Sequence, residues 1–202
     1  MPHWTMIEIV GFVAAGCILA ASIPQVIALV KHGGHGVSLG SWSLLLATSL
    51  VWCAYGIRIG SPSTVIGNAA GVVAFAVVVG LLVRNRTGAW WPVVGLAPAA
   101  VVLFAAASMA PLAVTAVLAV LLGFTLALPQ LVESYGTFRR RDASEVALGA
   151  WRLLLAGQLL WLLYGLVRSE WAIVIVNVAA AAASTGILLL ESRNRMAVGH
   201  AR

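Results

Sequence analysis

Apolar runs long enough to cross a membrane occupy most of this chain. A spanning helix needs about 20 predominantly apolar residues, and 202 residues leave room for at most about eight such helices with short connections. The runs are separated by short polar breaks. We therefore predict helices over 6–30, 39–57, 64–83, 90–107, 111–131, 148–167 and 171–190. The sequence thus indicates an all-α membrane protein with seven transmembrane helices.

Composition excludes several other classes of protein. Only 9% of residues are charged and 62% are hydrophobic, against about 25% charged in an ordinary soluble domain. A soluble enzyme, a disordered tail and a disulfide-framed secreted module are all excluded. Cys17 and Cys53 lie inside apolar runs without metal-ligand spacing, which predicts buried thiols and no metal site. We find no catalytic motif and expect no cofactor, so the lipid bilayer is the first partner implied.

The basic residues predict the orientation of the chain. The net charge of +6 does not indicate nucleic-acid binding here, because lysine and arginine collect in the cytoplasmic segments of membrane proteins. With the N-terminus outside, the two outer basic residues are Arg58 and Arg168. The inner ten are Lys31, Arg84, Arg86, Arg139, Arg140, Arg141, Arg152, Arg193, Arg195 and Arg202. We therefore expect a multi-pass protein of the plasma membrane with a cytoplasmic C-terminus.

The chain contains an internal repeat. Shifted by 109 residues, the segment 37–70 lies on 146–179 with 16 identical pairs in 34 positions. Leucine, alanine and valine would often coincide by chance in such a chain, but paired Trp, Tyr, Gly and Asn would not. Earlier in each copy, Pro24-Gln25 corresponds to Pro129-Gln130 at a shift of 105. The first three predicted helices (6–30, 39–57 and 64–83) and the last three (111–131, 148–167 and 171–190) are therefore copies of one three-helix unit.

The odd number of helices follows from this repeat. Two three-helix units fused directly would be inverted relative to each other, and one extra span restores a parallel orientation. We therefore divide the chain into a first three-helix bundle (1–86), a linker helix (87–110), and a second bundle with a cytoplasmic tail (111–202). Parallel repeats of this kind are typical of one class of transporter.

These motifs resemble a known family. A three-helix unit with Pro-Gln near the inner end of its first helix resembles the PQ-loop proteins. Trp52-x-x-Tyr55-Gly56 followed by Asn68, and Trp161-x-x-Tyr164-Gly165 followed by Asn177, resemble the SWEET and SemiSWEET sugar transporters, and the layout is like that of full-length SWEETs. The resemblance implies transport of a sugar. Plant-type SWEETs carry a further proline near the start of the second and sixth helices, which 39–46 and 148–155 lack.

The repeated Trp and Asn residues predict a substrate pocket. Trp52 and Asn68 both lie roughly 6–8 Å below the outer ends of their helices, as do Trp161 and Asn177. Indole rings stack on sugar faces, and amides bond to hydroxyl groups. Thr48 and Gly157 lie one turn before Trp52 and Trp161 and would lie on the same helix faces as these tryptophans. The resemblance supports a place for both residues in the pocket. The alternatives are that the tryptophans anchor the protein at the membrane interface, that the asparagines bond between helices, and that Thr48 and Gly157 only allow close packing.

Two further sets of residues are candidates for moving parts. Pro24 and Pro129 each remove a backbone hydrogen-bond donor from their helix. This favours a hinge at an inner gate, to which Gln25 and Gln130 would also belong. A static kink is the alternative. Tyr55 with Arg58, and Tyr164 with Arg168, lie at outer helix ends. There they could close an outer gate by hydrogen bonds or cation–π contacts, or serve as interfacial anchors.

The distribution of acids favours uncoupled transport. Glu8 lies near the outer end of the first helix, and Glu133 and Glu191 lie at inner ends, so we expect no ionisable group deep in any span. Ion coupling usually needs such a group. We therefore predict facilitated transport of a mono- or disaccharide by alternating access. A proton-coupled PQ-loop amino-acid transporter and a membrane sorting receptor on the same fold are the alternatives. The small residues of 179–184 permit close packing within a chain or in a homo-oligomer.

Overall fold

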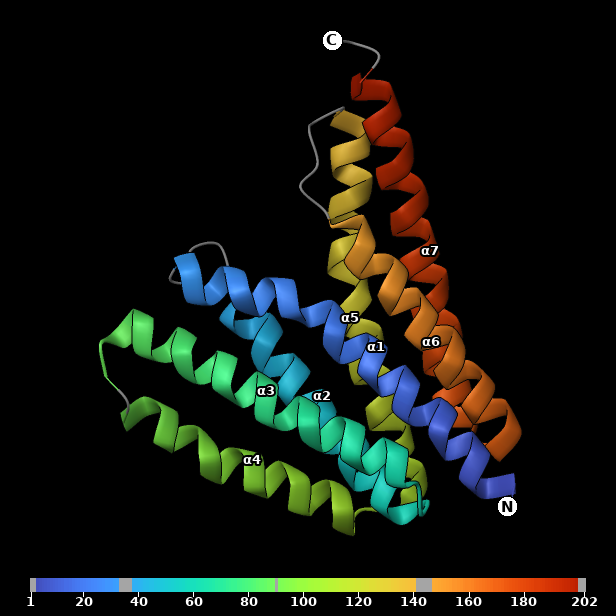
Figure 1. Ribbon diagram of the computed structural model, residues 1–202. Coiled ribbons are helices and arrows are strands. Elements are labelled where there is room, and N and C mark those ends of the chain that lie inside the picture. The colour runs from blue at the N-terminus through green and yellow to red at the C-terminus, as the bar shows by residue number, and fades with distance from the viewer. Residues whose placement is uncertain (1–2, 33–37, 90, 141–146, 200–202) are drawn as a thin grey trace.

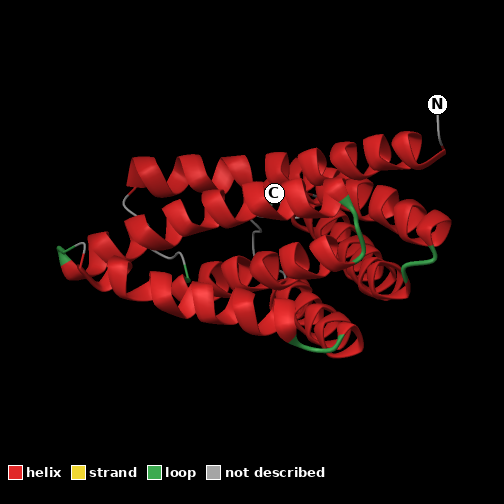
Figure 2. Cartoon of the chain, turned by 90° about the horizontal axis from the view of Figure 1, so that it is seen from below, coloured by secondary structure: helices red, strands yellow, loops and turns green. Residues whose placement is uncertain are grey.

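The computed structural model describes residues 3–32, 38–89, 91–140 and 147–199, and every regular element in these ranges is a helix (Figure 2). Loops and turns lie only at helix ends (Figure 2). The helices, in chain order, are α1 (His3–His32), α2 (Leu39–Arg58), α3 (Pro62–Thr87), α4 (Trp91–Met109), α5 (Leu112–Arg140), α6 (Leu148–Arg168) and α7 (Trp171–Gly199).

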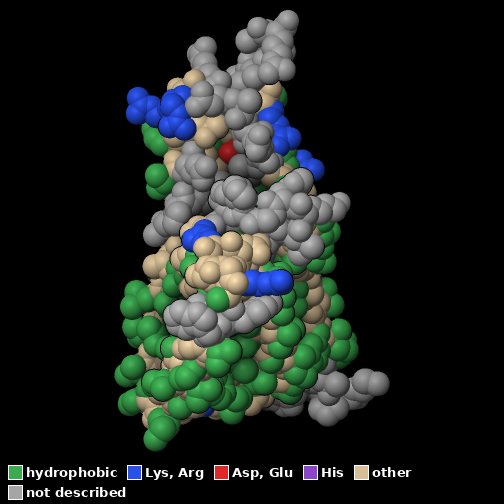
Figure 3. All heavy atoms as spheres, turned by 90° about the vertical axis from the view of Figure 1, so that its left-hand side faces the viewer, with side chains coloured by type: hydrophobic (Ala, Val, Ile, Leu, Met, Phe, Trp, Pro, Cys, Tyr) green, Lys and Arg blue, Asp and Glu red, His purple; other side chains and the backbone are tan. Residues whose placement is uncertain are grey.

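Five of the helices are long and apolar enough to cross a membrane. They are α1, α2, α3, α6 and α7, while the described apolar windows of α4 and α5 are shorter (Val94–Met109 and Leu112–Thr125). Apolar side chains cover much of the lower body of the molecule, and basic side chains gather above them (Figure 3). The chain is thus a multi-pass integral membrane protein.

Two helices extend well beyond the spans predicted for them. α5 continues to Arg140 and α7 to Gly199, nine residues past the predicted ends at 131 and 190. A prediction based on apolar runs ends where polar residues begin, but backbone hydrogen bonds within a helix do not depend on the lipid. In α5 the Arg140 guanidinium folds back over Gly136, one turn earlier, where a side chain would crowd it. The two helices therefore project together beyond the other elements (Figure 1).

The helices form two groups of three with the same internal order. α3 packs between α1 and α2, and α7 packs between α5 and α6. Between the groups, α1 packs against α6 and α2 against α5, while α4 packs against α2 and α3. The first helix of each group thus contacts the second helix of the other.

Corresponding turns join the second and third helices of each group. Ser61 N–H donates to the Gly56 carbonyl at 2.9 Å, and Glu170 N–H donates to the Gly165 carbonyl at 2.8 Å. A Cβ on Gly56 would lie 3.0 Å from the backbone nitrogen of Val65, and one on Gly165 would lie 3.1 Å from that of Val174. Glycine is required at both positions because the next helix begins against it.

The buried core joins the helices in three places. Trp42 and Phe75 meet edge to face at 5.7 Å between α2 and α3. Val51, Ala54, Ala107 and Ala119 connect α2 with α4 and α5. The third cluster consists of Ile7, Tyr55, Tyr164, Ala172 and Ile173, from both groups.

The two groups of helices meet at one end and diverge at the other. The start of α1, the α2–α3 and α6–α7 turns, and the α4–α5 connection gather at one end, which we call the sealed end (Figure 1). The far ends of α1 and α3 lie well away from those of α5 and α7, and we call this the open end (Figure 1). The cluster that contains both tyrosines lies at the sealed end.

Candidate functional site

Two tyrosines cross between the helix groups at the sealed end. The Tyr55 hydroxyl of α2 donates to Glu170 Oε2 at 2.7 Å, and Glu170 is the residue directly before α7. The Tyr164 hydroxyl of α6 lies 2.6 Å from the hydroxyl of Ser61, the N-cap residue of α3. Each tyrosine therefore reaches the residue that starts the third helix of the opposite group.

A single proton on Tyr164 fixes the direction of its bonds. Its hydroxyl also lies 2.7 Å from Glu8 Oε1, and an ionised carboxylate only accepts hydrogen bonds. Tyr164 therefore donates to Glu8 and accepts from Ser61. The Thr64 hydroxyl, 2.7 Å from that of Ser61, then donates to Ser61, so the four side chains form one directed chain of hydrogen bonds.

Glu8 connects three helices. Its Oε2 accepts from the backbone N–H of Ser63 at 2.8 Å, in the first turn of α3, where the helix dipole favours a negative charge. Its Oε1 lies 3.4 Å from Arg168 Nη1, and both side chains are 12% exposed. Glu8 thereby joins α1 to the start of α3 and to the end of α6.

Arg168 makes two further contacts, one across the groups and one within α6. Its Nη2 donates to the carbonyl of Ile59 at 2.9 Å, and its guanidinium carbon lies 5.8 Å from the centre of the Tyr164 ring, within cation–π range. Its counterpart Arg58 makes a different contact, with the carbonyl of Ala110 between α4 and α5. The two arginines predicted as partners in a gate therefore act at different junctions.

The repeated tryptophans lie next to these tyrosines. Trp52 meets Tyr55 edge to face at 5.5 Å, and Trp161 meets Tyr164 in the same way at 5.2 Å. Both tryptophans are partly buried and pack against the same cluster around Ile7 and Ile173. The structure thus brings the two sequence-repeated Trp-Tyr pairs together, directly behind the sealed end.

The repeated asparagines make matching bonds within their own helices. Asn68 Nδ2 donates to the Thr64 carbonyl, and Asn177 Nδ2 donates to the Ile173 carbonyl, each at 2.8 Å and one turn back. Asn68 is half-buried, and Asn177 is 9% exposed. These bonds hold both amides in equivalent orientations.

The residues one turn before the tryptophans are both buried. The Thr48 hydroxyl donates to the Leu44 carbonyl at 2.7 Å. A Cβ on Gly157 would lie 2.9 Å from Ile18 Cγ1 and 3.0 Å from the carbonyl oxygen of Ala14. The face of α6 at Gly157 is therefore in close contact with α1.

This contact predicts the effect of adding one methyl group. Gly157→Ala should lower the stability of the protein by about 1–3 kcal/mol, because α1 must move away from α6. Gly95→Ala in α4 is the matched control, since a Cβ there meets nothing within 4 Å, and alanine should stabilise the helix by about 0.5–1 kcal/mol. The measurement is thermal unfolding of both purified variants, and equal melting temperatures would contradict the close contact.

The predicted hinge residues lie within continuous helices. Pro24 and Gln25 are part of α1, and Pro129 and Gln130 are part of α5. Their side chains lie outside the described set, so their role stays a prediction. Inside the α4 span, Pro98 shows that a helix of this protein continues through a proline.

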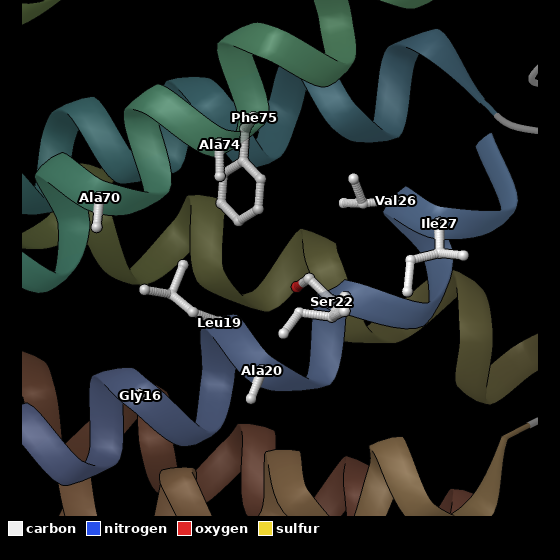
Figure 4. Close-up of a pocket in the computed structure, with 10 residues that line it drawn as sticks. Gly16, Leu19, Ala20, Ser22, Val26, Ile27, Ala70, Ala74 and Phe75 are labelled. Carbon is white, nitrogen blue, oxygen red and sulfur yellow. The ribbon is translucent and has the colours of Figure 1, made fainter. Parts of the chain in front are cut away.

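A hollow of about 480 Å³ lies between α1 and α3. Its lining is apolar except for the Ser22 hydroxyl, which donates to the Ile18 carbonyl at 3.4 Å. Leu19, Ser22 and Val26 from α1 face Ala74 and Phe75 from α3 (Figure 4). The tryptophans and asparagines of the predicted pocket do not line it.

Sequence reasoning missed three residues of the sealed end: Glu8 as a bonding partner, Ser61 and Glu170. Ser61 and Glu170 occupy equivalent positions at the shift of 109 residues, six residues after each tyrosine. A search restricted to identical pairs overlooks them because one is a serine and the other a glutamate. The expectation that ionisable groups avoid the spans is also too strict, because Glu191 lies within an apolar span and is 1% exposed.

Comparison with known proteins supports the fold. No protein-family model matches the sequence, and no curated protein matches it significantly. A solved structure of a eukaryotic SWEET transporter superposes with a TM-score of 0.76 at 14% sequence identity, over 95% of this chain and 99% of that one. That neighbour is a transporter and not an enzyme. The chain therefore has the fold of a SWEET transporter.

Proposed function

We propose that this protein is a transporter that moves a mono- or disaccharide across the plasma membrane by alternating access, without ion coupling. The observation that carries the proposal is the reciprocal seal at one end of a SWEET-like fold. Tyr55 and Tyr164 each bond across to the opposite helix group, while the same groups diverge at the other end (Figure 1). Alternating access requires such an asymmetry between the two ends.

The two groups are proposed to be the moving parts. Residues 1–86 and 111–202 would form two parallel bundles, joined by a linker helix over 87–110 that stays with the first. Pro24 with Gln25, and Pro129 with Gln130, are proposed as hinges at the inner gate. With the N-terminus outside, the sealed end faces outward, and Tyr55, Tyr164 and Arg168 form the outer gate. Arg58 would support it by holding α2 to the α4–α5 connection.

The substrate is proposed to bind behind the outer gate. Trp52 and Trp161 offer ring faces, and Asn68 and Asn177 offer amides held in equivalent orientations. Thr48 and Gly157 would border this site; the contact of Gly157 with α1 gives it a packing role there. A neutral ligand with several hydroxyl groups fits this set better than a charged peptide would.

Uptake into proteoliposomes tests the proposal. Labelled glucose or sucrose should enter vesicles that contain the wild-type protein faster than empty vesicles. Asn68→Ala and Asn177→Ala should each reduce uptake by about 5- to 30-fold, since loss of a hydrogen bond to a substrate hydroxyl costs on the order of 1–2 kcal/mol. Wild-type flux equal to that of empty vesicles for both sugars would refute sugar transport.

Proton-coupled amino-acid transport stands as the second candidate because of one observation, the buried carboxyl of Glu191. Amino-acid uptake driven by a pH gradient, together with no sugar flux, would favour it. The sorting-receptor alternative gains no support from the contacts described above.

A further inference from the structure

The hollow between α1 and α3 is an elongated apolar space at membrane depth. Its lining on α1 runs from Gly16 to Ile27, which is roughly 16 Å of helix. On α3 it runs from Ala70 to Phe75, inside an apolar span. The one polar side chain of the lining is Ser22, whose hydroxyl is bonded within α1. The shape and the lining therefore suit an extended apolar group and not a sugar.

The hollow begins where α1 stops touching α3. Near the sealed end the two helices are in close contact, because a Cβ on Gly67 of α3 would lie 2.6 Å from the Cβ of Ala15. One turn further along α1, Leu19 faces the hollow instead (Figure 4). Among the described residues, α1 packs more extensively against α6 than against α3, whereas α5 packs more extensively against α7 than against α2. The first helices of the two groups are therefore placed differently.

Two glycines account for this difference. Gly123 of α5 lets α7 approach, because a Cβ there would collide with Val176 of α7. The counterpart of Gly123 at the shift of 105 residues is Ile18 of α1. Ile18 lies against α6, where a Cβ on Gly157 would be 2.9 Å from its Cγ1. The sequence thus holds α5 against α7 but α1 against α6, so the hollow is built into the first group.

The second half carries larger side chains at corresponding positions. Leu19 and Val26, which line the hollow, correspond to Phe124 and Leu131 of α5. Leu131 reaches α7, because a Cβ on Gly186 would lie 3.3 Å from its Cδ1. An empty space would deprive its lining of dispersion contacts. In the first group this space is therefore left for a molecule from outside the chain.

The hollow is bordered by apolar side chains that are exposed. Ile23 of α1, which lines it, is exposed, as are Val73 and Val77 of α3, on the turns that follow Ala70. At membrane depth, exposed apolar side chains contact the acyl chains of the lipid, which are as apolar as they are. The hollow is therefore continuous with a surface that lipid covers.

Basic side chains lie at the open end of α3. Arg84 and Arg86 are exposed in its last turn, and basic side chains gather above the apolar body of the molecule (Figure 3). Arg84 follows Phe75 by roughly 14 Å of helix, close to the thickness of one leaflet of the hydrocarbon core, about 15 Å. A lipid phosphate at the level of the two arginines therefore places its acyl chain beside the hollow. Cations at this level favour an anionic lipid.

We propose that the hollow binds one acyl chain of an anionic phospholipid from the leaflet at the open end. The phosphate lies near Arg84 and Arg86, and the chain passes between α1 and α3. There it takes the place that Phe124 and Leu131 hold in the second group. The bound chain keeps α1 apart from α3 and thereby stabilises the packing of α1 against α6. The tryptophans and asparagines of the proposed sugar site do not line the hollow, so the lipid site does not rest on sugar transport.

Photocrosslinking in a membrane tests the site. The wild-type protein is reconstituted into phosphatidylcholine vesicles with a small fraction of phosphatidylglycerol that carries a photoreactive group in the middle of one acyl chain. Mass spectrometry should locate the adduct on 16–27 and 70–75. A probe with the same chain and a phosphatidylcholine headgroup should give about fivefold less adduct or lower, the factor that one cation contributes at the membrane surface. Adducts spread evenly over the exposed apolar faces would overturn the proposal.

Two variants fill the hollow from opposite walls. Ala70 of α3 and Ser22 of α1 both line it, and Ala70→Phe and Ser22→Phe should each lose most of the adduct, because an aromatic ring occupies the space of the chain. Ala69→Phe is the matched control, since Ala69 is exposed on the same helix and does not line the hollow. Its yield should equal that of wild type. A folded filling variant with the wild-type yield would show that the chain binds elsewhere, and the second variant serves if the first does not fold.

The repeat supplies a control for the headgroup contact. The double variant Arg84→Gln/Arg86→Gln should bring the yields of the two probes close to each other. Arg193 and Arg195 are the counterparts at the shift of 109 residues, are exposed and lie at the end of α7, and their double replacement by glutamine should leave the difference in place. An equal effect of both double variants would show a general attraction of charge and overturn the anionic site. If sugar uptake fails while these results hold, the proposed substrate is wrong and the lipid site stands.

Discussion

Replacing Glu8 with alanine should lower the stability of the protein by about 2–4 kcal/mol. The carboxylate accepts from the Tyr164 hydroxyl and from the Ser63 N–H, and pairs with Arg168. Its loss removes the pairing of Arg168 with Glu8 and leaves Ser63 N–H without its described acceptor. The loss is smaller than the full cost of breaking a buried ion pair, because both charged side chains are 12% exposed.

Thermal unfolding in detergent measures this effect. For a chain of this size, each kcal/mol corresponds to about 2–4 °C, so the melting temperature should fall by about 4–16 °C. Glu8→Gln should lose less, because its amide oxygen still accepts at one of the two positions.

Glu170→Ala is the matched control at the other crossing. In the described structure, the Glu170 side chain accepts one hydrogen bond, from Tyr55. Glu170→Ala should therefore lower the stability by about 1.5–3 kcal/mol, the range for a bond to a charged group. If Glu8→Ala melts at the wild-type temperature, Glu8 does not connect the helices as described.

The sequence predicted the helices well and the partners at the sealed end poorly. Apolar runs locate helices because lipid requires every backbone group to be bonded within its own segment. They do not locate helix ends in water, which is why α5 and α7 extend beyond the predicted limits. The close contact at Gly157 also depends on which face of α1 packs against α6. The sequence of α6 alone does not determine which face that is.

Comparison of the two halves shows why the bonding partners escaped prediction. Tyr55 and Tyr164 are identical between the halves and were found. Their partners cross between halves and differ: Glu170 accepts directly in one case, whereas Ser61 stands at the equivalent place in the other. There Glu8 supplies the carboxylate from α1, and its counterpart at the shift of 105 residues is Ala113. One carboxylate serves each tyrosine, but one directly precedes α7 and the other lies in α1, and repeat matching alone does not detect that exchange.

Removing both crossing hydroxyls should open the sealed end. In the double variant Tyr55→Phe/Tyr164→Phe, the rings and their contacts with Trp52 and Trp161 remain, and only the bonds to Glu170, Glu8 and Ser61 are lost. Each bond to a charged acceptor contributes about 1.5–3 kcal/mol. Tyr55 and Tyr164 belong to one buried cluster, so we take the loss of one bond as the minimum effect. That loss shifts the population by about tenfold or more toward the form open at this end.

Pulsed electron paramagnetic resonance measures that population. Spin labels on Ile57 and Leu166, exposed and equivalent positions of α2 and α6, would report the separation of the two groups once Cys17 and Cys53 are replaced. We expect a single short distance in the background protein and a second, longer distance in the double variant. Tyr135→Phe is the matched control, because Tyr135 is the one remaining tyrosine of the chain. It is 53% exposed and lies near the opposite end. A double variant with the short distance alone would show that the tyrosine hydroxyls do not hold the sealed end closed.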